Sequence, residues 1–88
     1  MVTFDLTKNA TNLDKHGVPL SLAMGIDWSE VLCCVDDRRD YRELREIGYA
    51  VIGIRFYCVV FTQRGDSMHV ISLRKANNRE KHIYAKHA

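Results

Sequence analysis

The sequence is short of chain-breaking residues: its 88 positions include one proline and five glycines. Together with an apolar content of 47%, this excludes a collagen-like, linker-like or intrinsically disordered chain. A chain of this length buries roughly 64% of the surface that it exposes when unfolded. That is enough for one hydrophobic core without disulfides or metal. We therefore expect a single domain spanning residues 1–88.

Long hydrophobic runs and paired cysteines are also missing. The longest apolar run, Gly48–Ile54, is far shorter than the roughly 20 residues that cross a bilayer, and no signal peptide is visible. Three cysteines are present, Cys33, Cys34 and Cys58, without any Cys-x-x-Cys motif. This usage is typical of reduced, buried thiols rather than of disulfides or a zinc site. We expect a cytoplasmic protein with no membrane segment and no bound metal.

The net charge is small, but positive charge is concentrated in the second half of the chain. The formal net charge is +2, yet residues 1–44 hold five basic and eight acidic side chains, and residues 45–88 hold eight basic and three acidic ones. Most of this excess lies from Arg74 onward, where five basic side chains stand against one acidic side chain. This asymmetry predicts a local anionic partner, although a solvated charged helix would have the same composition.

Two helices are predicted in the first third of the chain. The first spans residues 8–16, with Thr7 as its cap and Gly17 as its end. The second is short and has Pro19 as its first residue. Their apolar spacing predicts these buried residues: Leu6, Ala10 and Leu13 for the first helix, and Leu20, Ala23, Met24 and Ile26 for the second.

Strands dominate the rest of the chain. They are predicted over residues 2–6, 31–35, 44–51, 55–63 and 68–75, with a solvated loop at 36–40 and hairpin turns at Gly53 and Gly65. The 55–63 strand is apolar on both faces and is expected to be central and covered on both sides. In the last strand, simple alternation places Leu73 on one face and Val70, Ser72 and Arg74 on the other.

A terminal helix is predicted from about Asn78, where Asn77 and Glu80 have the spacing of a capping box. The order of elements predicts an α+β fold: an N-terminal strand and two helices packed on a mainly antiparallel sheet of four to five strands, followed by a C-terminal helix.

Four motifs, in order along the chain, resemble one family. They are Asn12-x-x-Lys15-His16-Gly17-Val18, Asp40-Tyr41-x-Glu43-x-Arg45, Arg55-x-Tyr57-x-Val59-Val60-Phe61-Thr62-x-Arg64 and Val70-Ile71-Ser72-Leu73-Arg74-Lys75-Ala76-Asn77-x-Arg79-Glu80, with Tyr84 one turn later. Together they resemble the BrnT toxins of bacterial type II toxin–antitoxin modules. The resemblance implies a RelE-like fold and a metal-independent ribonuclease that needs no cofactor and inhibits translation. It also implies a ribbon-helix-helix antitoxin as partner, with operator DNA bound only through the toxin–antitoxin complex.

Cleaving RNA without metal requires cations aimed at the phosphate, because stabilising the added negative charge is usually the largest contribution to catalysis. The family motif places such cations at Arg74 and Arg79, which we predict to be catalytic, and at Lys75 and Arg64, which we predict to bind substrate. The N-terminus of the last helix would add backbone N–H groups to this site. The alternative is that these residues form an ordinary solvated strand–helix junction.

Further candidates have a structural and a catalytic interpretation. Glu80 is either a general base or half of the capping box, and Tyr84 either contacts RNA or anchors the last helix. His16 is either an acid–base group or, with Lys15, a cation that stabilises the end of the first helix. We predict Glu80, Tyr84 and His16 as catalytic residues and Lys15 as a substrate-binding residue.

Two other functions remain open at this point. The same cations would suit a non-catalytic module that binds the antitoxin or nucleic acid, since no acid–base pair is unambiguous. A structural scaffold with an apolar docking patch near Leu20–Trp28 is the third possibility.

Overall fold

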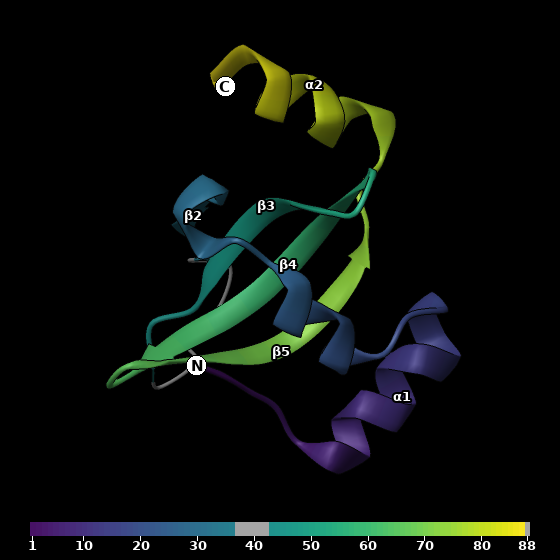
Figure 1. The fold of residues 1–88 in the computed structure, drawn as a ribbon, viewed down its shortest axis with the longest axis vertical. Coiled ribbons are helices and arrows are strands. Elements are labelled where there is room, and N and C mark those ends of the chain that lie inside the picture. The colour runs from purple at the N-terminus through teal and green to yellow at the C-terminus, as the bar shows by residue number, and fades with distance from the viewer. Residues whose placement is uncertain (37–42, 88) are drawn as a thin grey trace.

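The computed structural model describes residues 1–36 and 43–87, with a five-stranded sheet between an N-terminal and a C-terminal helix (Figure 1). The elements follow in the order β1 (Val2–Thr3), α1 (Leu6–His16), the 3-10 helices η1 (Leu20–Gly25) and η2 (Trp28–Glu30), β2 (Leu32–Val35), β3 (Glu46–Ile52), β4 (Arg55–Arg64), β5 (Ser67–Lys75) and α2 (Asn78–His87). The strand order is β1-β5-β4-β3-β2. β1 is parallel to β5, and all other neighbours are antiparallel. The α+β fold predicted from the sequence is confirmed, whereas its RelE-like kinship stays a prediction.

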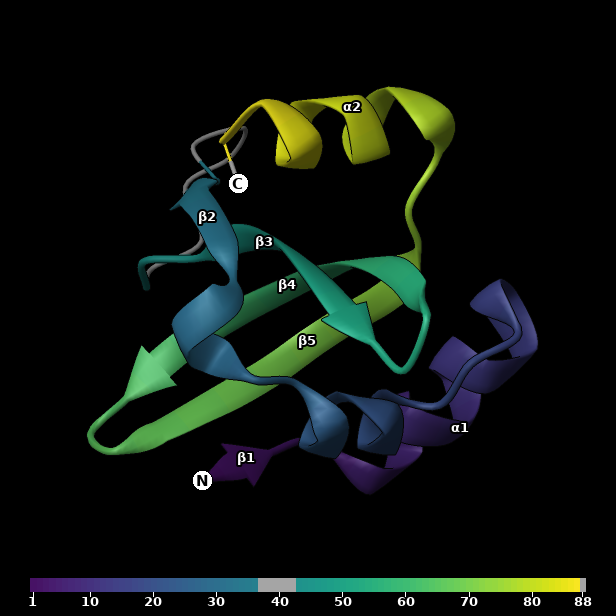
Figure 2. The same ribbon diagram turned by 45° about the horizontal axis from the view of Figure 1, so that its top comes forward.

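The core lies between one face of the sheet and the segment that crosses it as η1 and η2 (Figure 2). Its buried residues are Val18, Leu20, Ala23, Ile26, Ala50, Tyr57, Val59, Phe61, Val70 and Leu73. The central strand β4 is thus covered on this face as predicted. Its other face is covered only in part: Cys58 is buried there and Tyr84 of α2 packs on Phe56, but Cys58 and Val60 also line an open cavity. None of the described helices is long and apolar enough to cross a membrane.

Helix α1 ends where the sequence predicts but starts earlier. Its first residue is Leu6, and its cap is Asp5 rather than Thr7, since the Asp5 carboxylate accepts a hydrogen bond from the backbone N–H of Lys8 at 3.0 Å. Gly17 closes the helix with a φ of 77°, the left-handed conformation that glycine adopts at low cost.

The buried face of α1 is not the predicted one. Leu6, Ala10 and Leu13 are all exposed, Leu6 to 79%, and Asn12 is the residue that this helix buries. The reason is the position of α1 beside the edge of β5, where unpaired backbone groups of the strand need a polar partner rather than an apolar one. Asn12 supplies that partner at Leu73.

The second predicted helix forms as the 3-10 helix η1, with Pro19 just before it. A 3-10 helix has three residues per turn, so that residues three positions apart share a face. Leu20, Ala23 and Ile26 are therefore buried as predicted, and Met24 is not: it is 69% exposed.

A β-bulge in β5 changes the predicted facing of this strand. Two successive residues of β4 pair with Ser72 and Val70, which leaves Ile71 as an extra residue. Because of this bulge, Val70 and Leu73 both point into the core, although alternation had placed them on opposite faces. Ser72 and Arg74 lie on the face opposite Leu73 and the core, as alternation predicts.

The predicted burial of the thiols is wrong for two of the three cysteines. Cys33 and Cys34 are exposed because β2 is an edge strand, and Cys58 is buried in β4. Asp36, at the start of the predicted solvated loop, is buried as well. The remainder of that loop, residues 37–40, lies outside the described residues.

Candidate active site

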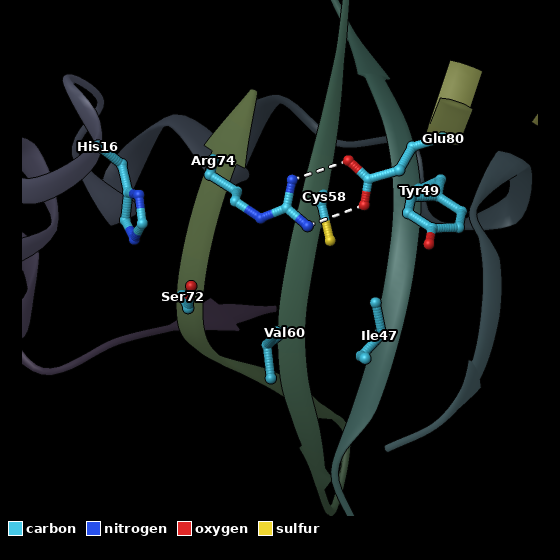
Figure 3. Close-up of a pocket in the computed structure, with 8 residues that line it drawn as sticks. All are labelled: His16, Ile47, Tyr49, Cys58, Val60, Ser72, Arg74 and Glu80. Atoms are coloured by element: carbon cyan, nitrogen blue, oxygen red, sulfur yellow. Dashed lines mark hydrogen bonds and ion pairs between the residues drawn. The ribbon is translucent and has the colours of Figure 1, made fainter. Parts of the chain in front are cut away.

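The sheet face opposite the core carries a cavity of about 380 Å³, within the range of roughly 300–1,000 Å³ that is typical of ligand sites. Two rows of side chains cross its floor from β3 to β5, and α1 and α2 each contribute one residue at its sides (Figure 3). The first row is Tyr49, Cys58 and Arg74, the second is Ile47, Val60 and Ser72, and the side residues are His16 and Glu80. We call this cavity the Arg74 pocket.

A two-point ion pair between Arg74 and Glu80 links β5 to α2. The Nη1–Oε1 distance is 2.7 Å and the Nη2–Oε2 distance is 2.8 Å. Glu80 also completes the predicted capping box: its carboxylate accepts from the backbone N–H of Asn77, and its own N–H donates to the Asn77 side chain, both at 2.9 Å. The pairing raises the pKa of Arg74 and lowers the pKa of Glu80, in each case chiefly through the hydrogen bonds between them. Glu80 therefore stays ionised at neutral pH and holds the Arg74 guanidinium in place.

One edge of the Arg74 guanidinium remains available. Nη1 and Nη2 bind Glu80, and Nη1 also donates to the carbonyl of Lys75 at 3.3 Å. Within the described residues, the Nε–H and the second hydrogen of Nη2 have no acceptor. These two N–H groups lie along one edge of the guanidinium, which suits a two-point contact to phosphate. Figure 3 shows this edge turned toward Ser72 and Val60.

His16 reaches the pocket because Asn12 fixes α1 against β5. The Asn12 amide donates to the carbonyl of Leu73 at 2.8 Å and accepts from its N–H at 3.2 Å, so the side chain pairs with the strand as a neighbouring strand would. The amide donates also to the carbonyl of Val18 at 2.7 Å. His16 lies four residues after Asn12, on the same side of the helix. The helix thus places His16 beside Arg74, the neighbour of Leu73 in β5.

His16 and Tyr49 flank Arg74 on its two sides (Figure 3). Burial, together with the positive charges of Lys15 and Arg74, lowers the pKa of His16 below 6.5, which favours the neutral ring at neutral pH. Burial is also the main cause that raises the pKa of Tyr49, with a contribution from Glu80, so the phenol keeps its proton. The pocket thus holds a proton acceptor and a proton donor on opposite sides of a fixed cation.

The other predicted site residues lie outside this pocket. Lys75 and Arg79 are exposed near the β5–α2 junction, and Lys15 is exposed on α1. Arg64 is at the far end of β4, roughly 20 Å along the strand from the Arg74 row, where it pairs with Glu43 at 3.1 Å. Arg64 therefore does not join the cations at the junction.

Tyr84 anchors α2 instead of facing the pocket. Its ring packs edge-to-face on Phe56 with centroids 5.3 Å apart, and its hydroxyl donates to the carbonyl of Glu30 at 3.2 Å. These contacts agree with the structural interpretation of this residue.

The sequence interpretation missed Tyr49 and Ser72 as pocket residues. The turn at Gly53 carried enough information for Tyr49, because a short hairpin through it sets Tyr49 opposite Cys58. The signal for Ser72 was its place two residues before Arg74, on the same predicted face of the strand. Across residues 1–36 and 43–87, no three His, Cys, Asp or Glu side chains come together as metal ligands would.

The ion pair makes the stability of the protein depend on pH in a way that can be measured. Replacing Glu80 by Gln keeps the capping box but removes the charge. We expect E80Q to be less stable by about 1.5–3 kcal/mol at pH 7, the usual contribution of hydrogen bonds to charged groups. Because the folded-state pKa of Glu80 is lowered, the stabilisation is present above its unfolded value of about 4.3 and is lost as the pH falls through the folded value. Urea unfolding at several pH values tests this, and a difference that does not shrink in acid would contradict it.

Fold and pocket together define a small α+β protein whose sheet carries, on the face opposite the core, a cavity with a fixed arginine. The chain belongs to the BrnT family of ribonuclease toxins of type II toxin–antitoxin systems, whose family model, described as "Ribonuclease toxin, BrnT, of type II toxin-antitoxin system", matches residues 4–80. The family implies an RNA target and an antitoxin partner. The match ends at Glu80, so it includes the whole Arg74 pocket and leaves Tyr84 outside. No curated protein matches the chain.

Proposed function

We propose that this chain is itself an active endoribonuclease that cleaves RNA in the Arg74 pocket without a metal ion. The observation that carries the proposal is the guanidinium of Arg74, held by Glu80 with its Nε edge free, between a neutral histidine and a protonated tyrosine. A cation fixed before substrate arrives stabilises the charge of the transition state without reorganisation.

The proposed reaction uses the 2′-hydroxyl of the RNA as the nucleophile. Its oxygen forms a bond to the adjacent phosphorus while its proton passes to His16. The bond from phosphorus to the 5′-oxygen breaks, which leaves a 2′,3′-cyclic phosphate on one fragment. The 5′-oxygen takes a proton from Tyr49, and Tyr49 regains it from His16 through solvent. Arg74 donates two hydrogen bonds to the phosphate oxygens throughout.

The remaining candidates have supporting roles in this proposal. Glu80 positions Arg74 rather than acting as a base, because its lowered pKa makes it a poor proton acceptor. Lys75 and Arg79 add positive charge near the β5–α2 junction, outside the pocket, and Tyr84 holds α2 in place. The proposed antitoxin is a ribbon-helix-helix protein, and the proposed complex binds operator DNA in the cytoplasm.

The pH dependence of cleavage tests the role of His16. In the presence of a chelator, kcat/KM is expected to rise with pH, with an apparent pKa below 6.5, and then to level toward neutrality as the ring loses its proton. Replacing His16 by Gln should lower kcat/KM by about 10²-fold or more and remove the acid limb of the profile.

The matched control is His82→Gln, which changes an exposed histidine of α2. H82Q should keep both the wild-type kcat/KM and the acid limb of its pH profile. An H16Q variant that retains the acid limb, or wild-type cleavage that the chelator abolishes, would contradict the proposed mechanism.

A further inference from the structure

A second, shallower cavity of about 160 Å³ runs along α1 beside the Arg74 pocket. It is lined by Lys8, Thr11, Asn12, Lys15, His16, Ile71 and Ser72. We call it the α1 groove. The groove and the Arg74 pocket share His16 and Ser72, so the two cavities are neighbours that meet at these residues.

The α1 groove carries positive charge without a counter-charge. Lys8 and Lys15 are two helical turns apart and therefore lie on one side of α1. Neither ammonium group pairs with a carboxylate among residues 1–36 and 43–87, and no described acidic side chain lines the groove. The polar Thr11 hydroxyl donates to the carbonyl of Thr7 at 3.0 Å, so the lysines are the donors free for a ligand.

Ser72 of β5 lines both cavities. It lies two residues before Arg74 on the same face of the strand, and its hydroxyl has no partner within the described residues. A chain of anionic groups would thus meet Lys8 and Lys15, then Ser72 and His16, and then the free edge of Arg74. A positively charged groove that leads to a catalytic site is typical of proteins that bind the backbone of single-stranded nucleic acid.

We propose that the α1 groove is a subsite for phosphates of single-stranded RNA next to the one cleaved, bound by Lys8 and Lys15. This inference rests on the proposed function, since it names the substrate that the Arg74 pocket would take. It implies that the enzyme prefers RNA that extends beyond the two nucleotides at the scissile bond.

A binding measurement tests the groove independently of catalysis. The probe is a labelled, single-stranded RNA of about a dozen nucleotides with 2′-O-methyl groups, which cannot be cleaved through a 2′-hydroxyl. We expect K8Q/K15Q to raise its Kd at least fivefold and to reduce the slope of log Kd against log salt by about 1.4, or about 0.7 for each lost phosphate contact. K81Q/K86Q removes the same charge from exposed positions of α2 and should leave that slope unchanged.

A cleavage measurement completes the test. For unmodified RNA, the ratio of kcat/KM for a dozen nucleotides to kcat/KM for a dinucleotide should fall about tenfold in K8Q/K15Q, and the change should be in KM. The proposal would be overturned if K8Q/K15Q and K81Q/K86Q lost RNA affinity equally. It would also be overturned if the ratio of kcat/KM for long and short RNA stayed unchanged in K8Q/K15Q. A K8Q/K15Q variant that binds RNA normally and loses only affinity for an antitoxin would overturn it as well. If wild-type protein binds the probe through these lysines but cleaves no RNA, the groove stands and the proposed ribonuclease activity falls.

Discussion

Replacing Arg74 by lysine is expected to reduce RNA cleavage about 10³-fold while the protein stays folded. Lysine keeps a positive charge beside Glu80, so the buried carboxylate is not left alone. Its ammonium group is a single point charge and cannot bind Glu80 at two points while presenting a second edge to phosphate. The loss of one such preorganised donor typically costs about 10²–10³ in kcat, and Arg74 offers two. Single-turnover cleavage measures the loss, and a thermal melt shows that the fold is retained.

The control for this substitution is Arg55→Lys. Arg55 is an exposed arginine at the start of β4, outside the Arg74 pocket, and the same change there should leave cleavage near the wild-type rate. Near-normal cleavage by R74K would mean that the free Nε edge is not the phosphate contact. The site would then have to be sought elsewhere on the protein.

Replacing Asn12 by Ala should destabilise the protein by about 2–4 kcal/mol, the largest effect on stability that we expect from one substitution. Asn12 is 7% exposed and makes three hydrogen bonds to the backbone of Val18 and Leu73. Its removal leaves three backbone groups without partners in a buried site, and each unsatisfied group costs about 1–3 kcal/mol before the structure relaxes. A change of this size lowers the melting temperature by roughly 10 °C or more in a domain of this length.

Asn78→Ala is the matched control, because it makes the same change at an exposed position of α2. It should alter the free energy of unfolding by less than about 0.5 kcal/mol. Urea unfolding of both variants at neutral pH gives the comparison. An N12A variant as stable as N78A would show that the pairing of Asn12 with Leu73 does not hold α1 against β5, and the placement of His16 would lose its explanation.

Local signals were sufficient for most features that depend on near neighbours, although the cap of α1 is Asp5 and not the predicted Thr7. The turns at Gly53 and Gly65, the end of α1 at Gly17, and the capping box of Asn77 with Glu80 each depend on residues a few positions apart. Such features follow from backbone conformation and short-range hydrogen bonds, so that the strands and both terminal helices could be predicted from the sequence.

Long-range packing was harder to predict for a physical reason. The face that α1 buries depends on its place at the polar edge of β5, and so a pattern of leucines pointed to the wrong side. The facing of Val70 depends on one extra residue, Ile71, and nothing in an apolar strand marks such a bulge. The position of Arg64 depends on strand length: the turn that contains it lies at the opposite end of β4 from the Arg74 row.

The residues of the candidate site likewise divide into those that the sequence indicated and those that depend on long-range packing. Arg74, Glu80 and His16 came from the family motif, and the structure gathers all three around one cavity. Tyr49 follows from the short hairpin at Gly53, which fixes the register between β3 and β4. Lys8 needs the packing of α1 on β5 and is therefore accessible only once the fold is known.

The chemistry of the RNA ends is the most direct test of the central claim that the Arg74 pocket cuts RNA through its own 2′-hydroxyl. Purified protein should be incubated with single-stranded RNA in the presence of a chelator, and the new ends should be analysed for wild type and R74K. We predict 2′,3′-cyclic phosphate and 5′-hydroxyl ends from wild type and almost no product from R74K. Ends carrying 3′-hydroxyl and 5′-phosphate groups, or no cleavage by wild type at all, would contradict the account.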